Sequence, residues 1–88
     1  MIHSNLFCMQ AFISIVEKKS FSLAAIELDV QEYILQLAIK QLENKFNVTL
    51  FNWESFSIIL TESGMSIYEY FKLFDDELLI LIEDFAED

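Results

Sequence analysis

Few side chains in this sequence are suited to catalysis or to holding a metal. His3 is the single histidine and Cys8 the single cysteine, so no His/Cys cluster has metal-ligand spacing. Asp75 and Asp76 are adjacent on a predicted helix and would point in different directions, which does not suit shared acid/base chemistry. Gly64 is the single glycine, so the chain has no phosphate-binding loop. We therefore predict no enzyme activity, no cofactor and no metal.

Without catalytic groups, the protein is expected to act by binding, and its net charge indicates which class of partner it binds. The 88 residues correspond to one domain. Fifteen acidic residues against five lysines and no arginine give a net charge of −10. Because DNA binding depends on Lys and Arg at phosphates, this composition argues against nucleic acid and favours a protein partner with a basic surface. The alternative is that the acidity only keeps a small apolar protein soluble.

The apolar content is high for a domain of this size. Hydrophobic residues make up 55% of the chain, with nine Phe, three Tyr and one Trp, so we expect some apolar surface to be covered by a partner. Cys8 lies among apolar residues at helical spacing and is predicted to be a buried core thiol. No basic segment precedes the apolar run at residues 6–16, which is too short to span a bilayer, so we predict a cytoplasmic protein.

Hydrophobic periodicity predicts three helices in the first half of the chain. The first covers residues 6–18. The second begins at Ser20 or Ser22 as N-cap and ends at Leu28, followed by a turn at residues 29–30. The third covers residues 31–47, where Asn47 is suited to the left-handed conformation that ends a helix.

A two-stranded β-wing and a long last helix are predicted next. The strands are residues 49–51 and 56–60, and Thr61 caps a helix that continues to about Phe85. The whole chain, residues 1–88, is expected to be one domain, in which residues 1–64 form the winged-helix core and residues 65–88 form the C-terminal helix and acidic tail.

The last helix carries apolar residues at alternating spacings of 4 and 3, which is typical of a heptad seam. Such a seam predicts a homodimer formed through this helix. The alternative is a helix that packs only within its own chain. The predicted dimerisation residues are Ile67, Phe71, Phe74, Leu78, Leu81 and Phe85.

The segment from about residue 9 to residue 64 resembles, without a gap, the N-terminal winged helix-turn-helix domain of LysR-type transcriptional regulators. The matching residues are Phe12, the SFSLAA run at residues 20–25, Leu28, Ile39, Leu42, Glu43, Val48, Leu50, Phe51, Leu60, Thr61 and Gly64. The resemblance implies a mostly α winged helix-turn-helix fold, with three helices and a two-stranded wing, followed by a linker-type helix that pairs two chains. The family's large effector-binding domain has no counterpart in these 88 residues.

The departures from the family pattern fall on the surface that would contact DNA. Where the family typically has Ser-Gln-Pro or Ser-Gln-Ser, this chain has Gln31, Glu32 and Tyr33. Where the family has a serine and commonly an arginine, Gln36 and Leu37 are present. A glutamate can accept a hydrogen bond from cytosine, but no neighbouring arginine or lysine offsets phosphate repulsion.

The wing departs from the family in the same way. The family pattern Leu-Phe-x-Arg, with further basic residues after it, is replaced by Trp53, Phe56 and Ile59, and Lys40 retains one positive charge. Aromatic residues often dominate protein interfaces. We therefore expect a protein-binding patch, unless Trp53 or Phe56 folds into the core. Its predicted residues are Glu32, Tyr33, Gln36, Leu37, Trp53 and Phe56.

The acidic C-terminal segment completes the functional hypothesis. Residues 52–88 contain ten of the fifteen acidic residues. Asp75 and Asp76 would contact a basic partner, or the segment would simply be a solvated helix face. The sequence thus favours an inhibitor, most concretely an immunity protein or antitoxin that blocks a basic, nuclease-type toxin. The alternative is a LysR-like transcriptional regulator or regulator fragment that binds DNA or sequesters another regulator.

Overall fold

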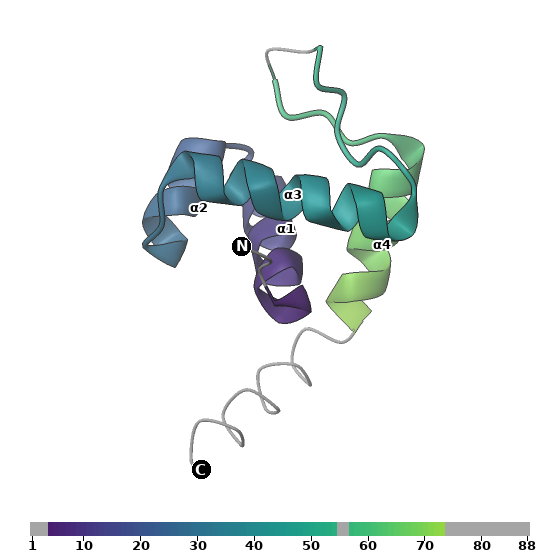
Figure 1. The fold of residues 1–88 in the computed structure, drawn as a ribbon. Helices are drawn as coiled ribbons and strands as arrows, with labels where there is room; N and C mark the ends of the chain where they lie inside the picture. The colour runs from purple at the N-terminus through teal and green to yellow at the C-terminus, as the bar shows by residue number, and fades with distance from the viewer. Residues whose placement is uncertain (1–3, 55–56, 74–88) are drawn as a thin grey trace.

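The computed structural model describes residues 4–54 and 57–73, and within these ranges the chain forms four helices. They are α1 (Asn5–Lys18), α2 (Phe21–Leu28), α3 (Glu32–Phe46) and α4 (Glu62–Leu73). α1 contacts each of the other three, α3 most extensively, and α2 and α4 lie at opposite ends of α3 (Figure 1). The predicted mostly helical architecture is confirmed.

Hydroxyl side chains cap the starts of α1, α2 and α4. Ser4 caps α1, and the Ser20 hydroxyl accepts a hydrogen bond from the Leu23 N–H at 3.1 Å. Thr61 Oγ1 accepts from the Gly64 N–H at 2.9 Å. Each cap satisfies a backbone donor that has no partner within the helix. Of the two predicted caps of α2, Ser20 is the one used, and the Thr61 cap is confirmed.

α1, α2 and α3 each end at a residue in the left-handed conformation. Lys19, Asp29 and Asn47 have φ values of 56°, 57° and 56°, and each donates its backbone N–H to a carbonyl of the preceding turn. Asn and Asp tolerate this conformation better than most residues. The prediction for Asn47 is confirmed, and these three sharp ends keep the connections between helices short.

Aromatic rings from three segments converge on α1 at the centre of the core. Phe12 is fully buried and meets Phe51, Tyr68 and Phe71 edge-on, at centroid distances of 5.5, 6.5 and 5.9 Å. Cys8 is also fully buried, as predicted, and burial raises the pKa of its thiol. Phe51 and Phe71 are buried too, and the other buried apolar residues in the described ranges are Ala11, Ile13, Ile15, Ala24, Ala25, Leu35, Ala38, Ile39, Leu42 and Leu50.

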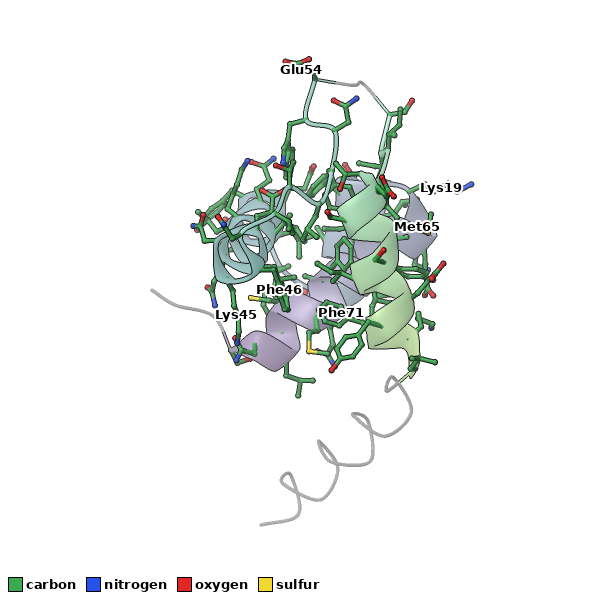
Figure 2. All side chains as sticks on the ribbon, turned by 90° about the vertical axis from the view of Figure 1, so that its right-hand side faces the viewer. Lys19, Lys45, Phe46, Glu54, Met65 and Phe71 are labelled. Carbon is green, nitrogen blue, oxygen red and sulfur yellow. The ribbon has the colours of Figure 1, made fainter. Side chains whose placement is uncertain are left out.

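The described parts of the wing, residues 49–54 and 57–60, project beyond the helices, and Glu54 lies far from them (Figure 2). The two limbs of the wing meet at one antiparallel bridge, between Phe51 and Leu60, and the Asn52 N–H donates to the Ile59 carbonyl at 2.8 Å. The predicted pair of strands is therefore not confirmed in the described part of the wing. The limbs pair too briefly there to form a ladder. Phe56 lies outside the described residues.

α4 packs on its own domain as far as it is described. Phe71 is 2% exposed and contacts Phe12 and Phe46, while Ile67 is half-buried against the core. Figure 2 shows Phe46 and Phe71 facing each other between α3 and α4. These two seam residues contact the core of their own chain, and pairing of two chains through the helix stays a prediction. The other predicted seam residues and the two aspartates lie outside the described residues: Phe74, Leu78, Leu81, Phe85, Asp75 and Asp76.

Candidate functional site

The turn between α2 and α3 brings these two helices into a fixed arrangement. Asp29 ends α2, and the Val30 N–H returns to the Ala25 carbonyl at 3.0 Å. Ala24 and Ala25 are buried, and their small side chains let α2 pack close to its neighbours. α3 therefore starts directly beside α2, with one side against the core and the other facing outward.

The exposed side of α3 contains the residues predicted from the sequence. Its buried stripe is Leu35, Ala38, Ile39 and Leu42. On the opposite side Tyr33 and Leu37 are 56% and 52% exposed, and Glu32, Gln36 and Lys40 are exposed as well. These five side chains are hereafter called the α3 outer face.

Glu32, at the start of the α3 outer face, is held by α2. The Ser22 hydroxyl donates a hydrogen bond to Glu32 Oε2 at 3.1 Å. Both residues line an open depression together with Lys19 and with Ser57 and Ile58 of the wing. The Glu32 carboxylate therefore has a preferred orientation at the junction of α2, α3 and the wing. Sequence reasoning did not predict this bond, because its partners are ten residues apart across a turn.

Trp53 is neither a core residue nor a free surface residue. Its side chain is 39% exposed, and its ring lies 5.9 Å from Phe21 and 5.6 Å from Phe51 between centroids. The indole N–H donates to Glu43 Oε2 at 3.0 Å, and Lys40 Nζ lies 4.3 Å from the ring centroid. Trp53 thus connects the wing to both α2 and α3.

Glu43 is a site residue that the sequence analysis placed only among the family's framework positions. It is 9% exposed, and its Oε2 accepts from the Leu50 N–H at 2.7 Å and from Trp53. Its Oε1 lies 3.5 Å from Lys40 Nζ. Its position in the sequence could have indicated this role. An acidic residue next to Leu42, on the buried side of α3, needs hydrogen-bond donors for its carboxylate.

Other charged groups in the described part of the chain form surface ion pairs. Lys18 lies 3.2 Å from Glu27, and Lys72 lies 3.1 Å from Glu17. Among the residues described, no group of acidic, histidine or cysteine side chains could hold a metal ion. No helix in these ranges is both long enough and apolar enough to cross a membrane.

Two adjacent helices joined by a tight turn, with the second presenting an exposed face beside a wing, define a helix-turn-helix domain. The model of the bacterial regulatory helix-turn-helix proteins of the lysR family matches residues 8–65. The chain belongs to this family. The resemblance stated from its residues is therefore confirmed.

Two curated relatives carry regulator names. The chain is 30% identical over 80 residues to the uncharacterized HTH-type transcriptional regulator YcaN of Escherichia coli (strain K12), covering 91% of this chain and 26% of that protein. It is 25% identical over 77 residues to the RuBisCO operon transcriptional regulator of Allochromatium vinosum, covering 88% and 26%. The chain thus spans about a quarter of the length of these relatives.

Solved structures show the same fold. The crystal structure of a complex of BenM_DBD with benA site 1 DNA is 27% identical, with a TM-score of 0.77, and the match covers 92% of this chain and 94% of that one. Full-length OxyR of Pseudomonas aeruginosa, at 21% identity and a TM-score of 0.82, matches 97% of this chain and 28% of its own. The winged helix-turn-helix type of fold is therefore shown.

These findings overturn the functional hypothesis drawn from the sequence. The immunity-protein or antitoxin interpretation is wrong, and so is the prediction that nucleic acid is an unlikely partner, because the chain belongs to a family of DNA-binding regulators and matches a domain solved on DNA. The error has a physical reason. Net charge sums the whole chain, and ten of the fifteen acidic residues follow residue 51, outside α3.

Proposed function

We propose that this chain is the DNA-binding domain of a LysR-type transcriptional regulator and that α3 enters the major groove. One observation carries the proposal: α3 presents an exposed outer face in a domain that matches BenM_DBD, solved with DNA, over nearly the full length of both chains. In helix-turn-helix proteins the N-terminal residues of the second helix contact base edges. The names of the two curated relatives also support regulation of transcription.

The side chains of the α3 outer face suit base contacts in distinct ways. The Gln36 amide is able to bind adenine at N6 and N7, and the Glu32 carboxylate accepts from the N4 amino group of cytosine. Leu37 offers an apolar contact for a thymine methyl group. Tyr33 adds an exposed hydroxyl. We therefore assign these four residues to base recognition rather than to a protein partner.

Two exposed lysines are the proposed phosphate contacts. Lys19 ends α1 at the junction with α2, and its side chain extends away from the body of the domain (Figure 2). Lys40 is exposed farther along α3. Phosphate contacts of this kind fix register and orientation without carrying sequence information.

Pairing of two chains through residues 67–85 remains a proposal, as does the treatment of residues 1–88 as one domain. The heptad spacing of the sequence supports pairing, and regulators with this type of domain bind two half-sites about one helical turn apart when they are dimers. Sedimentation velocity of the full 88-residue chain checks this directly. A concentration-independent monomer would contradict it.

Selection from a random double-stranded DNA pool at low salt, followed by fluorescence anisotropy on the enriched sequence, tests the proposed function. We expect an enriched motif and binding that the double variant Gln36→Ala, Leu37→Ala weakens by tenfold or more, since each good base contact contributes about 1–3 kcal/mol. Met65→Ala, on the exposed surface of α4, is the matched control and should bind as the wild type does.

Two outcomes would contradict the proposal. One is the absence of both an enriched motif and measurable binding at about 50 mM salt, where phosphate contacts are strong. The other is unchanged binding by the α3 double variant, with circular dichroism showing that it remains folded. The second result would place the DNA contacts on another surface.

A further inference from the structure

One carboxylate oxygen joins α3 to the first limb of the wing. Glu43 Oε2 accepts from the Leu50 N–H at 2.7 Å and from the Trp53 indole N–H at 3.0 Å. Leu50 is where the chain enters the wing, and Trp53 lies three residues farther out. Both donors therefore fix the same limb to the same point on α3.

Two aromatic rings and one lysine also contact the indole ring of Trp53. Phe21 of α2 and Phe51 of the wing lie 5.9 and 5.6 Å from it between ring centroids. Lys40 Nζ stands 4.3 Å from the ring centroid and 3.5 Å from Glu43 Oε1. Trp53 thus contacts α2, α3 and the wing at once, although 39% of it is exposed.

These contacts add to a few others at the base of the wing, where the Thr61 N–H donates to the Leu50 carbonyl at 3.0 Å and Phe51 is buried in the core. The described limbs of the wing share one bridge, Phe51 with Leu60, instead of a ladder of hydrogen bonds. A hairpin with so little pairing is marginally stable by itself. Hydrogen bonds to a largely buried carboxylate are charge-assisted and stronger than neutral ones. The angle between the wing and α3 therefore depends on the side chains that tie them together.

We propose that Trp53 is a positioning residue: its bond to Glu43, with the ring held by Phe21 and Phe51, sets the wing at a fixed angle to α3 so that both elements meet the same DNA duplex. The pair is called the Trp53–Glu43 clamp. The role in DNA binding rests on the proposed function. The clamp itself is a property of the free protein and is testable without DNA.

Trp53 is the single tryptophan of the chain, so one indole N–H signal in a ¹⁵N NMR spectrum reports on the clamp. In the wild type we expect this signal to exchange slowly with water. In Glu43→Ala it should move and exchange faster. In Trp53→Phe, which keeps an aromatic ring and removes the donor, backbone amide signals at residues 50–53 and 57–60 should shift, while those of α1 remain in place.

The DNA-bound state is tested by anisotropy and by hydroxyl-radical footprinting on the selected sequence. Trp53→Phe should weaken binding about fivefold, the size expected for the loss of one part-buried hydrogen bond, and should remove protection at the edges of the footprint while the centre stays protected. Ile59→Ala, on the other limb of the wing and 47% exposed, is the matched control.

The other possible results refute either the clamp or the proposed function, and they can be told apart. Unchanged amide signals of the wing in Trp53→Phe would overturn the clamp, as would uniform loss of the footprint. A loss of helical circular dichroism in Trp53→Phe would also overturn it, because Trp53 would then support the whole fold. A wild-type protein that shows the NMR pattern but binds no DNA would refute the proposed function and leave the clamp standing.

Discussion

Gly64, near the start of α4, shows how one side chain could disturb the wing. A Cβ atom at this position would lie 2.2 Å from the Leu50 carbonyl oxygen and 3.0 Å from Leu60 Cδ2. The same carbonyl accepts the Thr61 N–H at 3.0 Å. Any side chain at Gly64 must therefore push α4 away from the point where the chain enters the wing.

Gly64→Ala is accordingly expected to lower the free energy of unfolding by about 1–3 kcal/mol, the usual range for overpacking. Urea unfolding followed by circular dichroism measures this change. Ser66→Ala, an exposed position on the same helix, should change it by less than about 0.5 kcal/mol. If Gly64→Ala were as stable as the wild type, the close approach of α4 to Leu50 would not be a constraint.

A second prediction concerns the DNA base that the domain prefers opposite Glu32. Its carboxylate only accepts hydrogen bonds and is oriented by the Ser22 hydroxyl. The selected DNA should therefore contain cytosine opposite Glu32, and Glu32→Gln should shift the preference to adenine, with about 1–3 kcal/mol of discrimination between the bases. Ser22→Ala should weaken the preference without changing the base. An identical motif for Glu32→Gln and the wild type would exclude Glu32 from base recognition.

At the scale of single residues, the sequence predicted which side chains of α3 are exposed but not the hydrogen bonds that orient the side chains of this helix. The period of α3 places Tyr33 and Leu37 opposite the core, and both are exposed. The bonds of Glu32 to Ser22 and of Glu43 to Trp53 join residues ten positions apart through turns. Such pairings depend on the angle between elements, which a periodic pattern does not contain.

At the scale of elements, local signals predicted the helices well. The ends of α1, α2 and α3 lie within one residue of their expected positions, since caps and left-handed residues act on the nearest turn. The wing was predicted less well, because pairing of its limbs depends on contacts across the loop. Two contacts between α1 and α2 were not predicted: the ion pair of Lys18 with Glu27 and the hydrogen bond that the Ser14 hydroxyl donates to Glu27 Oε1.

That α1–α2 contact predicts a dependence of stability on pH. Hydrogen bonds from Ser14 and Lys18 lower the pKa of Glu27. A carboxyl whose pKa is lowered by folding stabilises the protein above its unfolded pKa, and this contribution is lost as pH falls through the folded pKa. Because Glu27 is about half exposed, we expect a contribution of at most about 1 kcal/mol at neutral pH.

Urea unfolding of the wild type and of Glu27→Gln, at neutral pH and below about pH 4, where a glutamate is normally half protonated, measures this contribution. The variant should be less stable at neutral pH, and the difference should shrink on acidification. Glu69→Gln, exposed on α4, should show no such convergence. A constant difference between the wild type and Glu27→Gln would mean that the ionised carboxylate does not stabilise the α1–α2 contact.

At the scale of the whole molecule, net charge misled the functional prediction while the framework residues did not. The formal charge of −10 sums every ionisable group equally. An interface is decided by the charges near it, and screening limits their range to about 8–10 Å. The summed charge therefore says little about the potential at α3, whereas the turn and core residues specify the arrangement of α2 and α3.

The charge nevertheless has a consequence for how binding responds to salt. Each phosphate neutralised by a lysine contributes about −0.9 to the slope of log K against log salt concentration. Lys18, Lys40 and Lys72 form ion pairs with Glu27, Glu43 and Glu17, and of the three Lys40 lies on the α3 outer face. With Lys19 and Lys40 as the proposed phosphate contacts, we expect a slope of about −2 for one chain and about −4 for two.

Anisotropy titrations on the selected DNA between about 50 and 200 mM salt give this slope. Lys19→Gln should reduce its magnitude by about 0.9 for each bound chain, whereas Lys72→Gln should leave it unchanged. A slope near −10, or one unaffected by Lys19→Gln, would show that other groups hold the phosphates. A shallow slope with a strong sequence preference would mean that this domain obtains its affinity from base contacts and the fit of the wing more than from charge.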